Sequence, residues 1–176
     1  SFHAVSGFNN AGFVVLSDMD GLADFGKDWV VLGVIAALVV LGSLGYWVLL
    51  DMVTRRRFSI FTLTTKLVLT LTSVLLVVGI LAFLVFEYRN PETLGPLPVQ
   101  EKVLTSVFES VSGRTAGFTT VDFGATEQQT NFFFTGLMFI GGSSASVAGG
   151  IKVNTFAVVL VAVMSTIRGR TQVASF

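Results

Sequence analysis

The chain has 176 residues, of which 52% are hydrophobic and only 12% are charged, and its mean hydropathy is +0.79. This composition excludes an ordinary soluble domain, which needs more polar residues to cover its surface, and it indicates a membrane protein. Cysteine is absent, which excludes disulfides and thiolate metal sites, and the eleven basic and eleven acidic residues cancel, so only their distribution is informative.

The first element is one of two copies of a repeated motif. Residues 5–13 read VSGFNNAGF, and residues 111–118 read VSGRTAGF, one residue shorter. Both end in a polar residue, Ala, Gly and Phe. Two segments between them are long and apolar enough to cross a bilayer, so we expect both copies on the same side of a membrane. Residues 1–8 are then the end of a short helix that leads into the first copy.

Residues 29–50 contain no charged side chain, and at 1.5 Å per residue they would extend about 33 Å as a helix, roughly the hydrocarbon thickness. We predict a spanning helix there. Its glycines, Gly33, Gly42 and Gly45, favour close helix contacts over ion sites. A second spanning helix is predicted over residues 58–86, of which the last 20 are uncharged. Lys66 lies about two turns from its start, where a lysine side chain can snorkel to the interface.

The turn-rich segment 94–98, LGPLP, is a break before a third helix. Val103, Val107 and Val111 recur with helical spacing, and we predict a short pore helix over residues 99–112. This helix is too short to span. We expect the chain to enter the membrane, turn near Gly113 and return through residues 114–118. The negative end of the helix dipole would then favour a cation at the turn.

The last apolar run, residues 128–167, is interrupted by charge only at Lys152. As one straight helix it would extend about 60 Å, twice the hydrocarbon core. Its centre, residues 141–150, reads GGSSASVAGG, and glycine in a helix interior costs about 1 kcal/mol relative to alanine. Irregular backbone at membrane depth must be shielded by protein or line a wet cavity. We therefore predict a broken helix beside a pore.

Charge distribution predicts the orientation. Arg55, Arg56 and Arg57 lie between the first two spanning helices, and Arg168 and Arg170 follow the broken helix, so these ends are expected in the cytoplasm. The opposite connections are acidic. Residues 14–28 carry four aspartates against Lys27, and residues 118–129 carry Asp122 and Glu127. Either these are simply solvated loops, or they create a potential that attracts cations.

The repeated motifs and the segment from Met138 to Lys152 resemble the membrane subunit of the bacterial Ktr and Trk potassium transporters, most closely the Ktr type. The resemblance covers essentially the whole chain. It implies an all-α membrane protein built from repeats of helix, re-entrant pore loop and helix that resemble a potassium channel. Residues 1–57 would be the pore loop and second helix of one repeat, and residues 58–176 the complete following repeat. Family members have four repeats, so we expect the functional molecule to include more chain.

The resemblance also implies roles for individual residues. Two of four filter strands would present backbone carbonyls to dehydrated K⁺. They are Asn10, Ala11, Gly12 and Phe13 in the first copy, and Thr115, Ala116, Gly117 and Phe118 in the second. An intramembrane gate would lie beneath the filter. Its residues are Gly141, Gly142, Ser143, Ser144, Ala145, Ser146, Val147, Ala148, Gly149 and Gly150, with Lys152 just beyond them.

The function implied is potassium transport across the plasma membrane, with the filter on the extracellular side. Full-length subunits of the family form a homodimer on a cytosolic ring of nucleotide-binding regulatory subunits. No cofactor, nucleic-acid partner or enzymatic activity is expected, and the sequence leaves open whether Na⁺ acts as an activator. The alternative is a secondary transporter of another cation or small solute with a broken-helix midplane site. Those folds often use inverted repeats, whereas the two motifs here are parallel.

Two basic residues have competing interpretations. Arg114 adjoins the second filter motif, where an unpaired positive charge would oppose the entry of cations. We expect it to pair with a nearby carboxylate such as Glu109 or Asp122, and direct control of conduction is the other reading. Lys152 either belongs to the gate or serves only as a buried donor to carbonyls of the loop.

Overall fold

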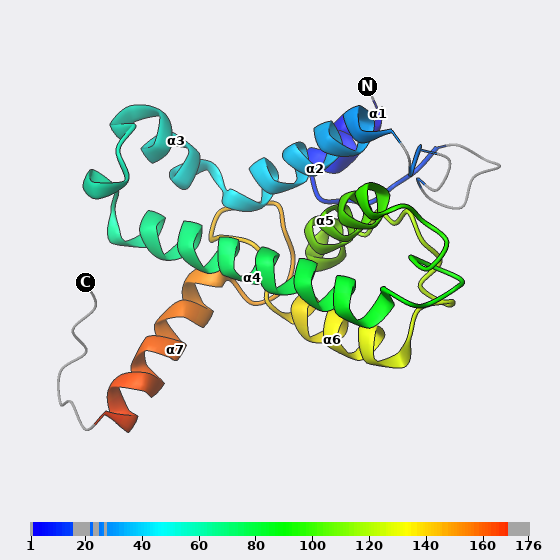
Figure 1. The fold of residues 1–176 in the computed structure, drawn as a ribbon. Helices are drawn as coiled ribbons and strands as arrows, with labels where there is room; N and C mark the ends of the chain where they lie inside the picture. Colours follow the sequence, from blue (N-terminus) through cyan, green and yellow to red (C-terminus); the bar gives the residue numbers. More distant parts are fainter. Residues whose placement is uncertain (1, 16–21, 23–24, 27, 169–176) are drawn as a thin grey trace.

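The computed structural model describes residues 2–15, 22, 25–26 and 28–168, and the regular elements in these ranges are helices (Figure 1). The α-helices are α1 (Phe2–Phe8), α2 (Trp29–Leu44), α3 (Tyr46–Arg55), α4 (Leu63–Glu87), α5 (Val99–Thr115), α6 (Gln128–Phe139) and α7 (Val153–Ile167), with a 3-10 helix at Phe58–Ile60. The all-helical fold class predicted from the sequence is confirmed. The acidic residues Asp18, Asp20 and Asp24, together with Lys27 and Arg170, lie outside the described residues.

Helix α4 is the long element against which the rest of the described chain is arranged (Figure 1). Its 25 residues extend about 37 Å, and within the described ranges it is the one single helix long and apolar enough to cross a membrane. Thr62 caps its start by accepting a hydrogen bond from the backbone N–H of Thr65 at 3.3 Å. The helix therefore begins after the predicted Phe58. Helices α5, α6 and α7 all pack against it.

The helix predicted over residues 29–50 is divided in two, which the sequence analysis did not anticipate. Helix α2 ends at Leu44, and α3 leaves it at an angle of 99°. Gly45 makes the break, with a φ of 78° that side-chain-bearing residues rarely adopt. Of the three glycines predicted to be helix contacts, only Gly42 serves mainly in that way: a Cβ there would lie 1.8 Å from the Phe8 carbonyl oxygen, whereas a Cβ on Gly33 would meet no atom within 4 Å.

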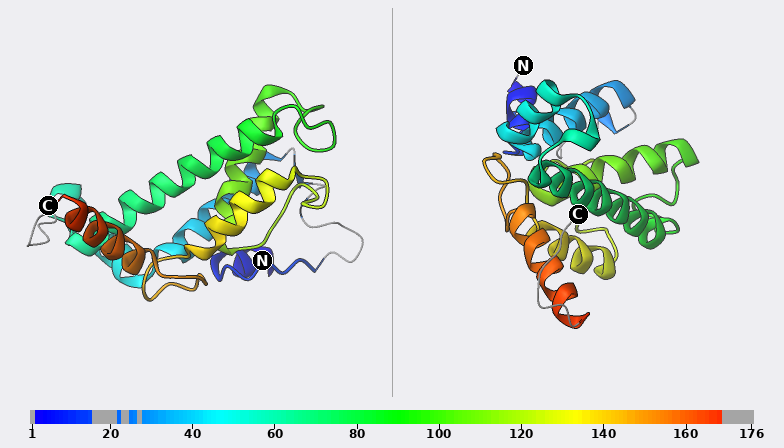
Figure 2. Two further views of the ribbon diagram at one scale, coloured as in Figure 1. Left: turned by 90° about the horizontal axis from the view of Figure 1, so that it is seen from below. Right: turned by 90° about the vertical axis from the view of Figure 1, so that its left-hand side faces the viewer.

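The short helix and the broken helix lie close to where the sequence predicts them. Helix α5 begins at the predicted Val99 but continues to Thr115, so the first residues of the second filter motif belong to its last turn. Helices α6 and α7 begin and end at the predicted residues 128 and 167. The chain between them is irregular, as the glycine content predicts. Helix α7 begins beside α4, and the right-hand view of Figure 2 shows that its C-terminal end points away from α6.

An apolar core joins α2, α5 and the second pore loop. Its buried members include Leu32, Ile35, Phe108, Val111 and Phe118. A second core lies between the ends of α4 and α6 around Phe83 and Phe134, whose rings meet edge to face with centroids 5.6 Å apart.

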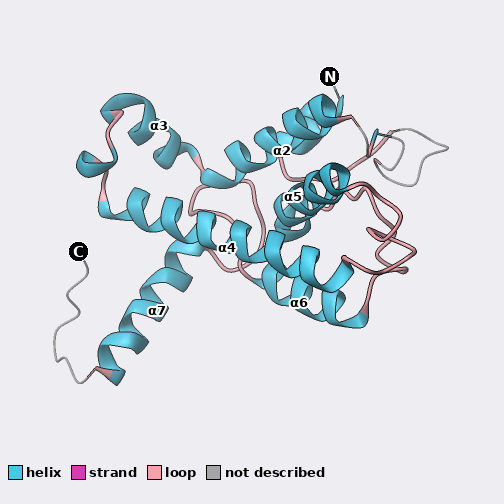
Figure 3. Cartoon of the chain, in the orientation of Figure 1, coloured by secondary structure: helices cyan, strands magenta, loops and turns pink. Residues whose placement is uncertain are grey.

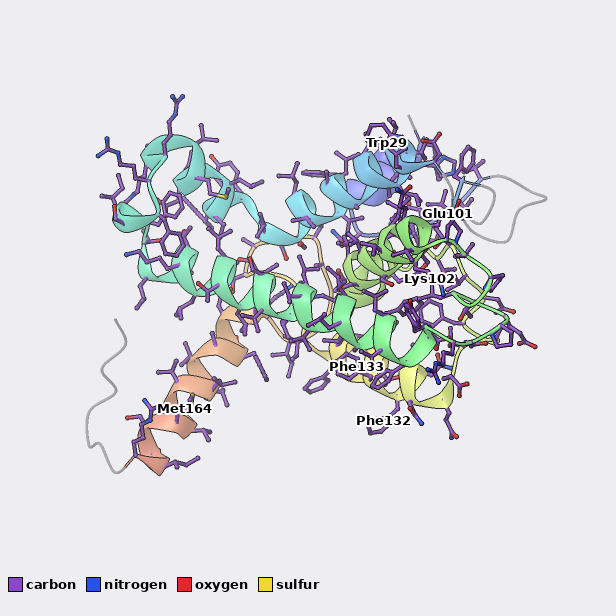
Figure 4. The ribbon with its side chains drawn as sticks, in the orientation of Figure 1. Trp29, Glu101, Lys102, Phe132, Phe133 and Met164 are labelled. Atoms are coloured by element: carbon purple, nitrogen blue, oxygen red, sulfur yellow. The ribbon has the colours of Figure 1, made fainter. Side chains whose placement is uncertain are left out.

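A third apolar cluster joins α2, α3 and α4 around Leu44, Val48 and Val68, but many other apolar side chains are exposed. Phe132 on α6 is 84% exposed and Met164 on α7 is 45% exposed (Figure 4). Such an exterior matches a chain surrounded by lipid and by further protein rather than by water.

The connections that follow α1, α4 and α5 meet at one end of the molecule, beside the last turn of α4 (Figure 3). The N–H of Leu22 donates to the Thr119 carbonyl at 2.9 Å, and the Asn90 side chain donates to the Ala125 carbonyl at 2.9 Å. Glu87 is fully buried among these connections. Its carboxylate accepts hydrogen bonds from the side chains of Asn90, Thr93 and Thr130 and from the backbone N–H of Glu127.

Candidate functional site

The first pore loop is held by two hydrogen bonds from one serine. After α1 ends at Phe8, Asn10 adopts a left-handed conformation with φ of 51°, and Gly12 does so with φ of 68°. The carbonyl of Ser6 accepts from the Ala11 N–H at 2.9 Å. The hydroxyl of Ser6 donates to the Phe13 carbonyl at 3.0 Å. The serine therefore ties the returning segment to the end of the helix on both sides of Gly12.

The second pore loop repeats this arrangement at equivalent residues. The carbonyl of Ser112 accepts from the Ala116 N–H at 2.9 Å, and its hydroxyl donates to the Phe118 carbonyl at 2.6 Å. Gly117, between them, has a φ of 82°. The two segments therefore share backbone geometry and bonding as well as sequence. Ser6 and Ser112 did not emerge as functional residues from the sequence, although the Ser-Gly pair common to both motifs was a visible signal.

The structure brings the two pore loops side by side. A Cβ on Gly12 would lie 2.2 Å from the Ala116 carbonyl oxygen, so only glycine allows this approach. The hydroxyl of Thr115 donates to the side-chain oxygen of Asn10 at 2.9 Å. The Phe118 ring is 2% exposed and comes within 3.8 Å of the position that a Cβ on Gly7 would occupy. All eight residues predicted for the two filter strands thus lie in one contiguous region.

Glu109 on α5 supports the chain that leaves the second pore loop. Its Oε1 accepts from the Thr120 N–H at 2.7 Å and from the Thr120 hydroxyl at 2.8 Å. The side chain is fully buried. These two short bonds to one buried oxygen hold the chain that leaves the second pore loop against the pore helix.

The chain between α6 and α7 forms a hairpin-like loop over residues 140–152, called here the α6–α7 loop. At its base, the Gly141 N–H donates to the Ile151 carbonyl and the Ile151 N–H donates to the Phe139 carbonyl, each at 2.9 Å. The two arms are so close that a Cβ on Gly141 would lie 1.5 Å from the Gly149 carbonyl oxygen. Glycine at position 141 is thus required by close contact of two backbones.

Two contacts from other elements and one bond within the loop hold the α6–α7 loop. The Ser143 N–H donates to the Ser43 carbonyl at 2.9 Å, which ties the loop to the break between α2 and α3. Lys152 Nζ donates to the Ala148 carbonyl at 2.7 Å, as expected for a donor to loop carbonyls. Arg114 donates from its guanidinium to the Gly141 carbonyl at 3.1 Å.

The expectation that Arg114 pairs with Glu109 or Asp122 is wrong. Arg114 is 5% exposed, and within the described residues the one ion pair joins Asp51 and Arg55. Arg114 follows Glu109 by five positions on α5, so the two side chains leave the helix in different directions. Glu109 bonds outward to Thr120, whereas Arg114 reaches inward to the α6–α7 loop. A buried guanidinium therefore connects the end of the pore helix with this loop.

A cavity of about 300 Å³ lies between the second pore loop and the α6–α7 loop. Its lining residues are Gly113, Arg114, Thr115, Gly117, Met138, Gly149 and Gly150. Within the described part of the chain, no group of three His, Cys, Asp or Glu side chains could hold a metal ion. The oxygen atoms that these lining residues carry are backbone carbonyls and the Thr115 hydroxyl.

Comparison with known proteins agrees with this architecture. Residues 1–174 match the family model described as "TrkH: Cation transport protein". The Ktr system potassium uptake protein B of Bacillus subtilis (strain 168) is 44% identical over 175 residues, and that of Vibrio alginolyticus is 39% identical over 177 residues. These alignments cover 99% of this chain but only 39% and 38% of the two relatives.

The crystal structure of the potassium transporter TrkH from Vibrio parahaemolyticus has the same fold, with a TM-score of 0.69 at 16% sequence identity. The alignment covers 99% of this chain and 36% of that one. Paired re-entrant loops beside a broken helix define a membrane transport protein with a repeated pore-loop architecture. The chain belongs to the TrkH family of cation transport proteins, and it spans about two fifths of the length of the curated relatives it matches.

Proposed function

We propose that the full-length protein transports K⁺ across the cell membrane through a filter to which this chain contributes two of four strands. The observation that carries this proposal is the duplicated hydrogen-bond pattern. In each loop, one serine bonds to the residues on both sides of a glycine with positive φ, and the two glycines lie next to each other. Backbone carbonyls held in this way can replace the hydration shell of an alkali cation. The filter residues are the eight predicted from the sequence.

Selectivity would then depend on rigid placement of these carbonyls. The Ser6 and Ser112 hydroxyls fix the carbonyls of Phe13 and Phe118, and Glu109 fixes the chain that follows the second loop. The names of the matched relatives, which include potassium uptake proteins from two organisms, support K⁺ as the cargo. K⁺ is then the transported ion, and the chain needs no resident cofactor.

The α6–α7 loop is proposed as the gate. It lies across the cavity from Gly117, and contacts from Ser43, Lys152 and Arg114 hold it in place. By the charge distribution, the filter end faces the outside, while Arg55 to Arg57 and Arg168 lie in the cytoplasm. A homodimer on a cytosolic ring of nucleotide-binding subunits would act on the gate from that side.

The filter assignment is tested by Gly117→Ser in the full-length protein, with Gly136→Ser on α6 as the matched control. A Cβ at either glycine would meet no atom within 4 Å, but only Gly117 has a positive φ. We expect Gly117→Ser to lower the preference for K⁺ over Na⁺ by about tenfold, because strain of 1–3 kcal/mol is expected for a side chain at such a φ. Gly136→Ser should retain selectivity. Uptake in proteoliposomes measures both, and unchanged selectivity in Gly117→Ser would remove the filter assignment.

A further inference from the structure

One side-chain hydrogen bond joins the two pore loops directly. Thr115, in the last turn of α5, donates from its hydroxyl to the side-chain oxygen of Asn10 at 2.9 Å. The two residues are 105 positions apart and belong to different repeats. Asn10 is 9% exposed, so water competes little for this bond.

Asn10 has a second attachment on its other side. Its amide nitrogen donates to the Val39 carbonyl on α2 at 3.3 Å. An asparagine side chain offers an acceptor and two donors, so it can bond in two directions at once. Asparagine also tolerates the left-handed conformation, here with φ of 51°, better than most residues. The side chain thus extends from helix α2 to the neighbouring repeat.

The spacing between the loops matters at the adjoining glycine. Gly12 approaches the Ala116 carbonyl so closely that a Cβ would lie 2.2 Å from its oxygen. The Asn10–Thr115 bond lies one to two residues before this contact in each chain segment. Loss of the bond would allow the two segments to separate, and the carbonyl oxygens of neighbouring strands would move apart with them.

We propose that Asn10 and Thr115 form a clamp between repeats that sets the spacing of two filter strands, and that their side chains are therefore specificity-determining. The inference rests on the proposed filter function. The first motif is one residue longer than the second, and its Asn9-Asn10 segment supplies the side-chain amide of the clamp. The second motif has Arg114 and Thr115 at the corresponding place, so this strand supplies the hydroxyl instead.

A double-mutant cycle in the full-length protein tests the clamp. Asn10→Ala and Thr115→Val each remove the bond, and Thr115→Ser keeps the hydroxyl. Asn9→Ala is the matched control, because the exposed Asn9 amide donates only to the Val5 carbonyl of its own helix at 2.9 Å. We expect each single variant to lower the K⁺ to Na⁺ uptake ratio by about three- to tenfold, as for loss of one buried hydrogen bond. The K⁺ to Na⁺ uptake ratio of the double variant should lie no more than about twofold below that of the less selective single variant.

The outcomes separate the clamp from the filter. Normal selectivity in Asn10→Ala and Thr115→Val, together with a loss in Gly117→Ser, would overturn the clamp and leave the filter in place. Normal selectivity in all three would overturn both. If both single variants fold, additive losses in the double variant contradict the proposal. If Asn10→Ala does not yield folded protein, Thr115→Val is compared with Thr115→Ser, and equal selectivity in this pair contradicts the proposal.

Discussion

The two pore loops have the same bonding but different surroundings. In both, a serine carbonyl accepts from an alanine N–H at 2.9 Å, and the hydroxyl of that serine reaches the carbonyl after the glycine. Phe118 is 2% exposed because it packs against the preceding repeat, whereas Phe13 is 69% exposed. The shared bonds show what one loop needs in order to form, and the difference shows that the second loop packs against the segment that contains the first.

The second helices of the two repeats differ in a comparable way. Both are interrupted, but α2 turns into α3 at the single residue Gly45, while α6 and α7 are separated by the α6–α7 loop. The two breaks lie against each other, since a Cβ on Gly45 would lie 2.9 Å from the Ser144 carbonyl oxygen. One break therefore changes the direction of the chain, and the other inserts a loop next to the second pore loop.

The largest expected effect separates the two glycines. Gly12→Ala should abolish selective K⁺ uptake, because alanine there is strained and its Cβ would overlap the Ala116 carbonyl oxygen. Gly117→Ala should retain partial selectivity, about tenfold reduced, because it is strained without overlap. Uptake of K⁺ and Na⁺ into cells lacking other potassium transporters measures the ratio. Equal damage at the two positions would show that backbone strain alone decides the outcome.

Shortening the α6–α7 loop should have the next largest effect. Removal of residues 144–147, in the middle of the loop, is expected to raise resting K⁺ flux about tenfold, because the proposed gate becomes smaller. Flux should change while the K⁺ to Na⁺ ratio stays constant, since the pore loops are untouched. Resting flux at the level of the parent protein would remove the gate assignment.

A smaller increase in flux is expected for Arg114→Met, which keeps the bulk of the side chain but removes the donor to Gly141. Hydrogen bonds from charged groups contribute about 1.5–3 kcal/mol, part of which is regained by no longer burying a charge. We expect about a threefold rise in resting flux. Arg56→Met, on the exposed end of α3, is the control and should leave flux unchanged. A fall in flux after Arg114→Met would show that Arg114 assists conduction rather than holding the loop.

The smallest expected effect compares the two serines. Ser112→Ala should lower the melting temperature of the purified protein by a few degrees, and Ser6→Ala by less, because the Ser112 bond is shorter, at 2.6 against 3.0 Å. Both variants leave a carbonyl without its donor. Thermal unfolding followed by fluorescence measures the difference. A larger shift for Ser6→Ala would show that the length of the serine bond does not determine how much it contributes to stability.

Composition and periodicity were sufficient to predict much of the fold. The start of α5 at Val99 and both outer ends of the broken helix follow from turn residues and from the length of the apolar run, which are local properties. The family resemblance is confirmed by the match over residues 1–174. The roles of the individual filter and gate residues remain predictions.

Features that depend on contacts between distant segments could not be predicted. The sharp bend at Gly45 gains its support from the α6–α7 loop, about a hundred residues later. The partner of Arg114 was predicted as a carboxylate on the basis of charge, but the direction in which the side chain leaves α5 takes it to a carbonyl. The hydrogen bonds of Ser6 and Ser112 could not be predicted, because each hydroxyl reaches a residue six or seven positions further along only when the pore loop has folded back.

Glu87 shows that an acidic residue does not always attract cations from solution. Four donors already occupy its two oxygens: two side chains on one, and a backbone amide and a hydroxyl on the other. Among the described residues no cationic side chain forms an ion pair with it, and these four donors compensate its charge. The carboxylate joins the segment that follows α4 and the start of α6 to the last turn of α4. Counting carboxylates would therefore overestimate the electrostatic attraction that this end of the molecule exerts on cations in solution.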